Sequence, residues 1–420
     1  MSNHKAPTSK DSSWQMNLPQ FDVTPKHSAY DVVIIGGATM GACSAWFLAS
    51  NPDFKGRVLI VEPDPTFAKA QTGASNNCMR QQFANPINVR IGQFAAEFAK
   101  AFRENLGGDA AIPELPIRNF GYLYLSDNSS LTSLLERDQQ VQAENGAGTR
   151  MVGRQEIAAQ YPFFRLDDIE AGSLNTQDEG YYNAPLMIEW LIKKSIERGV
   201  EYVRNKVVSI GRANDKVTSV TLESGEVIEA GHIVNAAGTR AGEIAAMAGL
   251  KLDIQPKRRY TFIFRAKQPL DRDLPLTIDP TGVHFRQFGD DYLVGCPPMG
   301  EDETVACDDF TAEEGIWEKK VHPILSKRIP QFSDVEIIDF WMGHYDFNTF
   351  DYNVVIGPHD VVSNFHFTNG SSGHGSQQGP AVGRGIAEQI IYGEFRSLDL
   401  SPFLYSRFAK GERVIERAVI

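Results

Sequence analysis

The chain has 420 residues, of which 42% are hydrophobic and 22% are charged, and its formal net charge is −12. This composition is that of a globular protein rather than a disordered one, and the length predicts two domains or one elaborated domain. The excess of acidic residues argues against binding to nucleic acid or to an anionic membrane surface.

Residues 1–28 are polar and lack the apolar core of a secretory signal. The pattern fits a flexible extension or an arm that contacts a partner subunit. No apolar run approaches the roughly 18 residues of a membrane span, so none is expected. The cysteines, which lack zinc spacing and predict no metal site, are Cys43, Cys78, Cys296 and Cys307. A reduced, cytoplasmic setting fits this usage best.

The first predicted unit is a strand, a glycine-rich turn, a helix and a second strand over residues 29–66. The first apolar run ends in the turn Gly36-Gly-Ala-Thr-Met-Gly41, and the second ends in the acid Glu62. This layout predicts a dinucleotide-binding Rossmann unit, with the pyrophosphate at the helix start and the acid on a ribose. Ala38 replaces the middle glycine, and an ordinary βαβ unit with a glycine-rich turn would share the pattern.

Helices and a β-meander are predicted in the middle of the chain. The elements, in order, are a helix over 89–106, a short hairpin at 120–125, a polar helix over 129–145, an amphipathic helix over 185–198, strands over 203–211, 216–222 and 227–235, and a helix over 240–248. The three strands form a meander that leads into a second glycine turn, at Gly238.

Alternating apolar and polar residues predict further strands over 254–265 and 282–296. A third glycine-rich turn, Gly370–Gly375, precedes a helix predicted over 380–391. The pattern divides the chain into an N-terminal extension at 1–28, dinucleotide-binding segments at 29–88, 152–252 and 347–397, sheet-rich segments at 89–151 and 253–346, and a tail at 398–420. Such interleaving is typical of large flavin-binding folds, whereas nicotinamide dehydrogenases usually keep the Rossmann unit contiguous.

Several motifs, taken together, are more specific than the first turn alone. They are Gly36–Gly41, Thr72–Ser75 with Gln81–Phe83, Asp178–Gly180, Asn235–Gly238, Trp341–Thr349, Ser372–Pro380 and Asp399–Leu404. From about residue 30 to 415, the chain resembles the D-amino-acid oxidase family of FAD-dependent oxidoreductases. It is most similar to the branch called FAD-dependent oxidoreductase domain-containing proteins, and it is similar to sarcosine and glycine oxidases.

The resemblance implies an α/β (α+β) fold in which a glutathione-reductase-like, FAD/NAD(P)-binding Rossmann domain is interleaved with an antiparallel-sheet substrate domain. It also implies that FAD is bound by residues of the motifs above. They are Gly36, Gly37, Ala38, Thr39, Met40, Gly41, Glu62, Pro63, Thr72, Gly73, Ala74, Ser75, Arg80, Gln81, Val207, Ala237, Gly238, Gly343, Gly370, Ser372, Gly373, His374, Gly375, Ser376 and Gln377.

The implied reaction is oxidation of a secondary amine or an amino acid to an imine, with hydride transfer to flavin N5. It requires orientation of the substrate and exclusion of water more than acid–base residues. The candidates on the substrate side are Arg80, Tyr345, His374, Arg258, Tyr260 and Arg286, with His284 beside them. Arg80 fits a surface ion pair as well as a flavin contact, and His374 fits a structural or flavin-adjacent role better than that of a base.

The chain departs from the family at positions that bear on the chemistry. Gly343 stands where sarcosine-oxidase-like members carry the cysteine that bonds to flavin, and Cys78 stands where other relatives carry a bonding histidine. We therefore expect non-covalent FAD, with Cys78 as the alternative link. Leu293 replaces the lysine that activates oxygen, so a quinone or another electron carrier competes with oxygen as the acceptor. Gln377 replaces a lysine that binds the substrate carboxylate.

Two other functions fit the same motifs. An FAD-dependent 2-hydroxy-acid dehydrogenase would use a related fold and the same cofactor. A non-catalytic flavoprotein that serves as an assembly factor would bind FAD without turning over a substrate.

Overall fold

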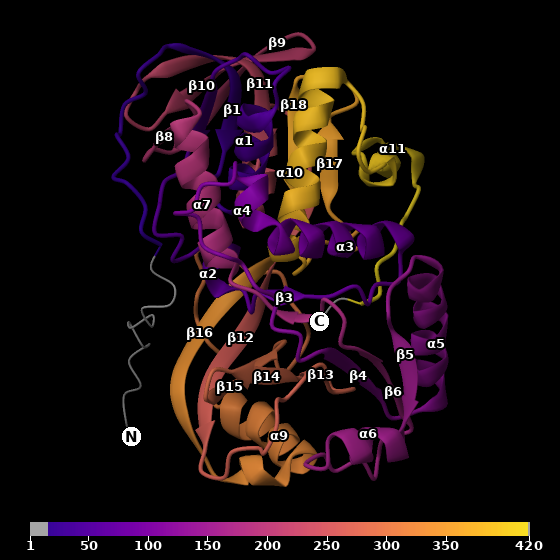
Figure 1. Cartoon of the computed structure of the whole chain (residues 1–420). Helices are drawn as coiled ribbons and strands as arrows, with labels where there is room; N and C mark the ends of the chain where they lie inside the picture. Colours follow the sequence, from indigo (N-terminus) through magenta and orange to yellow (C-terminus); the bar gives the residue numbers. More distant parts are fainter. Residues whose placement is uncertain (1–15, 419–420) are drawn as a thin grey trace.

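Two large sheets, one in each half of the molecule, dominate the computed structural model, which describes residues 16–418 (Figure 1). The strands of the first sheet are β1 (Ala29–Ile35), β2 (Val58–Val61), β8 (Glu201–Val203), β9 (Val207–Ala213), β10 (Lys216–Leu222), β11 (Val227–Asn235), β17 (Val355–Pro358) and β18 (Phe365–Asn369). Their order is β17-β18-β11-β1-β2-β8, and β10 joins β11 to β9. The central strands β18, β11, β1, β2 and β8 are parallel.

The apolar run of β1 explains its central place, because both faces of a parallel sheet are covered. Val32 and Ile34 pack on one face, with the helix that follows the glycine turn. Val33 packs on the other face, with the meander and the helix after Gly238. Side chains alternate between the faces of a strand, so one continuous apolar segment supplies both cores.

The helices cover the first sheet and flank the second (Figure 1). They are α1 (Thr39–Ser50), α2 (Gln71–Ala74), α3 (Pro86–Lys100), α4 (Phe102–Asn105), α5 (Ser129–Glu144), α6 (Arg154–Gln160), α7 (Ala184–Glu197), α8 (Ala241–Met247), α9 (His322–Arg328), α10 (Gly375–Tyr392) and α11 (Ser406–Lys410). The axes of α1 and α10 approach closely: a Cβ added at Gly383 would lie 2.5 Å from Cβ of Cys43. Between residues 16 and 418, no helix is long and apolar enough to cross a membrane.

The second sheet is antiparallel except where β13 meets β4. Its strands are β4 (Tyr122–Ser126), β5 (Arg150–Gly153), β6 (Ala171–Asn175), β12 (Ile254–Ala266), β13 (Leu276–Ile278), β14 (His284–Phe288), β15 (Asp291–Cys296) and β16 (Val335–Asn348), in the order β16-β12-β15-β14-β13-β4-β6-β5. A two-stranded sheet of β3 (Cys78–Met79) and β7 (Gly180–Tyr181) lies between the large ones (Figure 1).

Two local predictions were wrong, and one helix was missed. The apolar run near 120–125 does not form a hairpin, because β4 pairs with the distant strands β6 and β13. The last long helix begins at Gly375 rather than at residue 380, and Pro380 lies inside it. The α9 helix, which packs on the second sheet through Leu325, was not predicted in that sheet-rich segment.

The segment boundaries also shift. Strand β6 belongs to the second sheet, although residues 152–252 were assigned to the dinucleotide-binding part. Helix α3 packs with the core of the first sheet through Ile91 and Phe98, although residues 89–151 were assigned to the other part. Of the predicted N-terminal extension, residues 1–15 lie outside the described residues. Phe21 is anchored in the core, where its ring stacks on Tyr202 at 5.2 Å, so this part is not a flexible arm.

Candidate flavin site

A cavity of about 460 Å³ lies where the carboxyl ends of β1, β2 and β11 meet β12 and β16 of the second sheet. Ligands of open parallel sheets bind outside the carboxyl ends of the strands, so this is the expected place for a dinucleotide. The wall includes the turn after β1, the acid after β2, the turn after β11 and the start of α10. The three glycine-rich turns, which are far apart in the sequence, therefore meet at one cavity.

The first turn requires glycine at its two ends. Gly36 has a φ of +104°, and a Cβ there would lie 2.4 Å from the carbonyl oxygen of Ala236. A Cβ at Gly41 would lie 1.9 Å from the carbonyl oxygen of Gly36. Ala38 lines the cavity at the start of α1, so this helix presents its N-terminal end to a pyrophosphate.

Glu62 is fixed at the cavity wall by two backbone amides. Its Oε2 accepts from the N–H of Gly37 at 2.8 Å, and its Oε1 accepts from the N–H of Asp64 at 2.8 Å. Burial raises the pKa of Glu62 to about 7, against the lowering effect of these two bonds. A carboxylate oxygen has lone pairs beyond these two bonds, so the side chain can also accept from a ribose hydroxyl.

The third turn is held by a buried carboxylate below the start of α10. Asp346 accepts from the N–H of Gly370 at 2.8 Å and from Oγ of Ser371 at 2.7 Å. The turn therefore presents the N-terminus of an 18-residue helix to the cavity, with His374 as its N-cap residue. Such a helix end stabilises negative charge through its free amides and its dipole.

Arg80 lines the cavity beside the start of α10, is only 3% exposed and is not a surface residue. Its Nη1 donates to the carbonyl of Gln82 at 3.2 Å and to the hydroxyl of Tyr124, and its Nη2 donates to Nε2 of His374 at 2.8 Å. The guanidinium carbon lies 4.4 Å from the ring centroid of Phe83. No ion pair joins Arg80 to an acid in the part of the chain that the structure describes, so a positive charge remains at this wall.

The other substrate-side candidates divide between the cavity and the protein core. Tyr345 and His284 line the cavity, and burial lowers the pKa of His284 to about 4. Arg258 turns away to pair with Asp309, whereas Tyr260 borders the cavity and its ring stacks with Phe340. Of these two candidates, Arg258 was therefore the wrong choice, and Tyr260 lies at the wall.

Arg286 is buried behind the cavity wall, where it was not expected. Its Nη2 donates to the carbonyl of Asn76 at 2.9 Å, and its guanidinium lies 4.6 Å from the ring centroid of Tyr181. The sequence analysis missed Arg259, which lines the cavity, pairs with Asp302 and stacks on the ring of Tyr345 at 4.6 Å. Side chains alternate along a strand, so the grouping of Arg258 with Tyr260 left out Arg259, which lies between them.

Most of the predicted cofactor-binding residues line this cavity. They are Gly36, Ala38, Thr39, Met40, Glu62, Pro63, Thr72, Ala74, Ser75, Arg80, Val207, Ala237, Gly238, Gly343, Ser372, Gly373, His374, Gly375, Ser376 and Gln377. Five others stand behind the wall: Gly37, Gly41, Gly73, Gln81 and Gly370. Two of these five have a supporting role, since Gly37 and Gly370 donate to Glu62 and Asp346.

The residues present fit FAD. Two helix N-termini face the cavity, one for a pyrophosphate and one for the part of the isoalloxazine ring that becomes negative on reduction. Glu62 provides an acceptor for a ribose hydroxyl. The turns bring backbone rather than side chains to the cavity at Gly36, Gly238 and Gly373, which leaves room for a large planar group.

The comparisons with known proteins agree with this geometry. The model of the family "FAD dependent oxidoreductase" (DAO) matches residues 31–389. The chain is 32% identical to FAD-dependent oxidoreductase domain-containing protein 1 of Bos taurus, over 97% of this chain and 90% of that protein. It is 22% identical to sarcosine oxidase subunit beta of Rhizobium meliloti, over 92% of this chain and 90% of that protein.

Among solved structures, the L-proline dehydrogenase from P. horikoshii superimposes with a TM-score of 0.79 and 25% identity, covering 94% of this chain and all of that one. The predicted fold class is thereby confirmed. The family match extends across the glycine turn, Glu62, Arg80 and most of α10. The chain belongs to the DAO family of FAD-dependent oxidoreductases.

Proposed function

We propose that the protein oxidises a secondary amine or an amino acid to the corresponding imine. The observation that carries this proposal is Arg80, a buried cation on the cavity wall whose neighbours are neutral acceptors. A buried guanidinium that makes no ion pair within residues 16–418 favours a substrate that carries a carboxylate. Two proteins similar to this chain are named for sarcosine and L-proline, which are both secondary amines with a carboxylate.

The first sheet and its helices would form the FAD-binding domain, and the second sheet would form the substrate domain. FAD, when bound, supplies the acceptor of the hydride that leaves the substrate carbon. The residues of this chain would bind and orient the reactants, and the buried strands and turns of the wall would limit the access of water to them. Arg259 and Tyr345 close the wall on the side of the second sheet.

The charges around the cavity also select the protonation state of an amine. Burial and the neighbouring Arg80 lower the pKa of His374 to about 3, and burial lowers the pKa of His284 to about 4. Both rings are neutral near pH 7, whereas the guanidinium of Arg80 beside them carries a positive charge. A cation in a buried site disfavours a second positive charge, so the neutral amine is favoured over the ammonium form. The neutral amine is the form that can release a hydride.

The test is anaerobic stopped-flow reduction of the purified yellow protein with a panel of compounds. The panel contains sarcosine, proline, a primary amino acid, an N-methyl amine without a carboxylate, and 2-hydroxy acids matched in size. We expect bleaching of the flavin band by the amino acids and slower bleaching by the amine without a carboxylate. If only the 2-hydroxy acids bleached the flavin, the proposal would be wrong and the protein would be a 2-hydroxy-acid dehydrogenase. No bleaching by any compound would favour an assembly factor.

A further inference from the structure

The segment after α11 returns to the flavin cavity. In Figure 1 this yellow stretch leaves α11 and descends past the end of α3 toward the middle of the molecule. Each of the residues 414–418 makes a polar contact with another part of the chain. The motifs that identify the family end before this segment, so the sequence analysis treated it as a tail.

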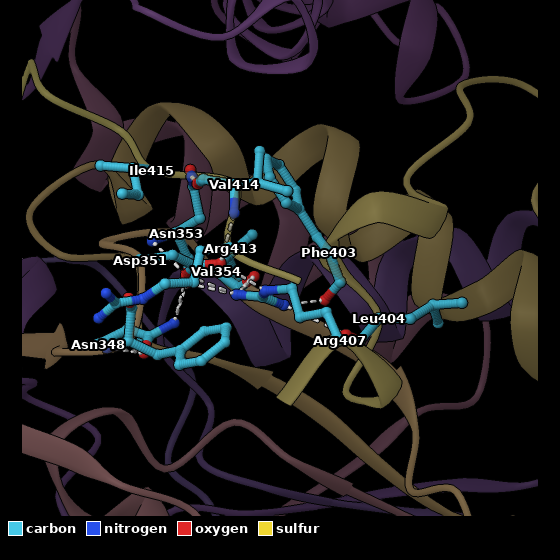
Figure 2. Close-up of polar contacts among 12 residues, drawn as sticks. Asn348, Asp351, Asn353, Val354, Phe403, Leu404, Arg407, Arg413, Val414 and Ile415 are labelled. Carbon is cyan, nitrogen blue, oxygen red and sulfur yellow. Dashed lines mark hydrogen bonds and ion pairs between the residues drawn. The ribbon is translucent and has the colours of Figure 1, made fainter. Parts of the chain in front are cut away.

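The upper end of the segment is fixed by a buried ion pair (Figure 2). Nε of Arg407 lies 2.7 Å from Oδ2 of Asp351, and both side chains are at most 3% exposed. Asp351 also accepts from the N–H of Val414 at 3.3 Å, and the carbonyl of Val414 accepts from Nδ2 of Asn353. The chain therefore leaves this cluster in a fixed direction.

Glu416 is the second anchor and is fully buried. Its Oε1 accepts from the N–H groups of Ala84 at 2.9 Å and Ala418 at 3.0 Å. Its Oε2 accepts from Nδ2 of Asn88 at 2.8 Å and Nδ2 of Asn85 at 3.1 Å. Four donors meet one carboxylate, and breaking such a buried set is costly.

This anchor brings Ala418 to Arg80. The carbonyl of Ala418 accepts from Nη2 of Arg80, which also donates to Nε2 of His374. A guanidinium nitrogen of this kind has two hydrogens, so the two acceptors occupy both. The hydrogens of Nη1 are taken by Gln82 and Tyr124. All four acceptors are neutral, so they fix the orientation of the guanidinium without neutralising its positive charge.

We propose that Glu416 is a positioning residue for the flavin site, and that it acts through the carbonyl of Ala418 on Arg80. The proposal rests on the proposed function only for the role of Arg80 toward an anionic substrate. Without the anchor at Glu416, the carbonyl of Ala418 leaves Nη2, and the guanidinium loses one of the four bonds that direct its charge at the cavity.

The test compares Glu416→Gln with Glu412→Gln, the same substitution at an exposed position of the same segment. Glutamine keeps the size but places an NH₂ group against two donors. Two readouts need no substrate: the rate of tryptic cleavage after Arg413 in the holoprotein, and the dissociation constant of sulfite, a small inorganic anion whose binding changes flavin absorbance. We expect the cleavage rate and the dissociation constant of sulfite to rise at least fivefold in Glu416→Gln and to stay unchanged in Glu412→Gln.

The route through Arg80 is tested by the double variant. In an Arg80→Met background, Glu416→Gln should not weaken sulfite binding further, because the two residues act as one unit. Faster cleavage with unchanged sulfite binding would overturn the proposal, since the segment would then be only structural. The proposal would also be overturned if the cleavage rate and sulfite binding were both unchanged, or if the effects of the two substitutions on sulfite binding were additive in the double variant.

A milder variant covers the case in which Glu416→Gln does not fold. Asn85→Ala removes only the bonds to Glu416 and to the carbonyl of Ile415, and the same changes are expected at about half the size. Because no substrate is involved, a failed substrate panel would refute the proposed function and leave this inference standing.

Discussion

Nη2 of Arg80 lies 2.8 Å from Nε2 of His374. Arginine can only donate, so Nε2 must accept, and the imidazole carries its proton on Nδ1. Burial and the charge of Arg80 also lower the pKa of His374 to about 3. His374 is therefore a neutral ring in a fixed tautomer, and its Nε2 is not available as a general base.

The buried histidines make the protein less stable in mild acid. Burial lowers the pKa of His366 to about 3, whereas a histidine of the unfolded chain titrates near 6.5. Between these two values the unfolded state binds more protons, so the free energy of unfolding falls as the pH falls through this window. From pH 7 to pH 5 the loss is about 2 kcal/mol for one such residue.

Urea unfolding of His366→Gln at pH 7 and at pH 5 measures this contribution. The variant should lose less stability than the wild-type protein between the two values, whereas the exposed His27→Gln should follow the wild type. If all three proteins lost the same free energy of unfolding between pH 7 and pH 5, His366 would bind its proton as readily in the folded state as in the unfolded state.

Glu62 should hold the adenosine ribose. Glu62→Gln keeps the size but sets an NH₂ group against the N–H of Gly37 or of Asp64. Hydrogen bonds to a charged group contribute about 1.5–3 kcal/mol, so the dissociation constant of FAD should rise at least tenfold. Fluorescence titration of the apoprotein measures it, with the exposed Glu144→Gln as the control. An unchanged constant would mean that Glu62 only fixes the turn.

FAD should be bound without a covalent link. A Cβ at Gly343 would lie 2.4 Å from Cβ of Ala74, so a cysteine does not fit there. Burial raises the pKa of the Cys78 thiol, which keeps it protonated and a poor nucleophile. Acid precipitation should release all flavin into the supernatant. Flavin that stays on the denatured chain and disappears in Cys78→Ser would contradict this.

The Rossmann unit and the three glycine-rich turns could be predicted from the sequence because each depends on local chemistry. The apolar run of β1 and the glycine at position 36 leave few alternatives. Pairing between distant strands was not predictable in the same way. Strand β4 pairs with β6 and β13, and the residues of β4 do not indicate which strands it will pair with. The choice of Arg258 on β12 was wrong for the same reason, since alternation along a strand does not say which side chains reach the cavity. The anchoring of Glu416 depends on donors more than 300 positions away.

Reduced enzyme should react slowly with oxygen. Leu293 is buried beside Arg286 in the second sheet and places no cation at the position of the oxygen-activating lysine. Stopped-flow reoxidation should be faster with a quinone or an artificial dye than with air-saturated buffer. Rapid production of hydrogen peroxide would contradict this expectation and would direct attention to Arg80.

The reductive half-reaction of Arg80→Met tests the central claim most directly, because it removes the charge and keeps much of the side-chain stem. Wild-type protein and variant are compared under anaerobic conditions, with the compound that bleaches the wild-type flavin fastest and with its analogue that lacks the carboxylate. We predict that the variant keeps its FAD, has a lower flavin potential and is reduced at least tenfold more slowly by the carboxylate compound, with a smaller change for the analogue. An equal rate and an equal potential in the two proteins would contradict the account and would move the substrate anchor to Arg259 and Tyr345.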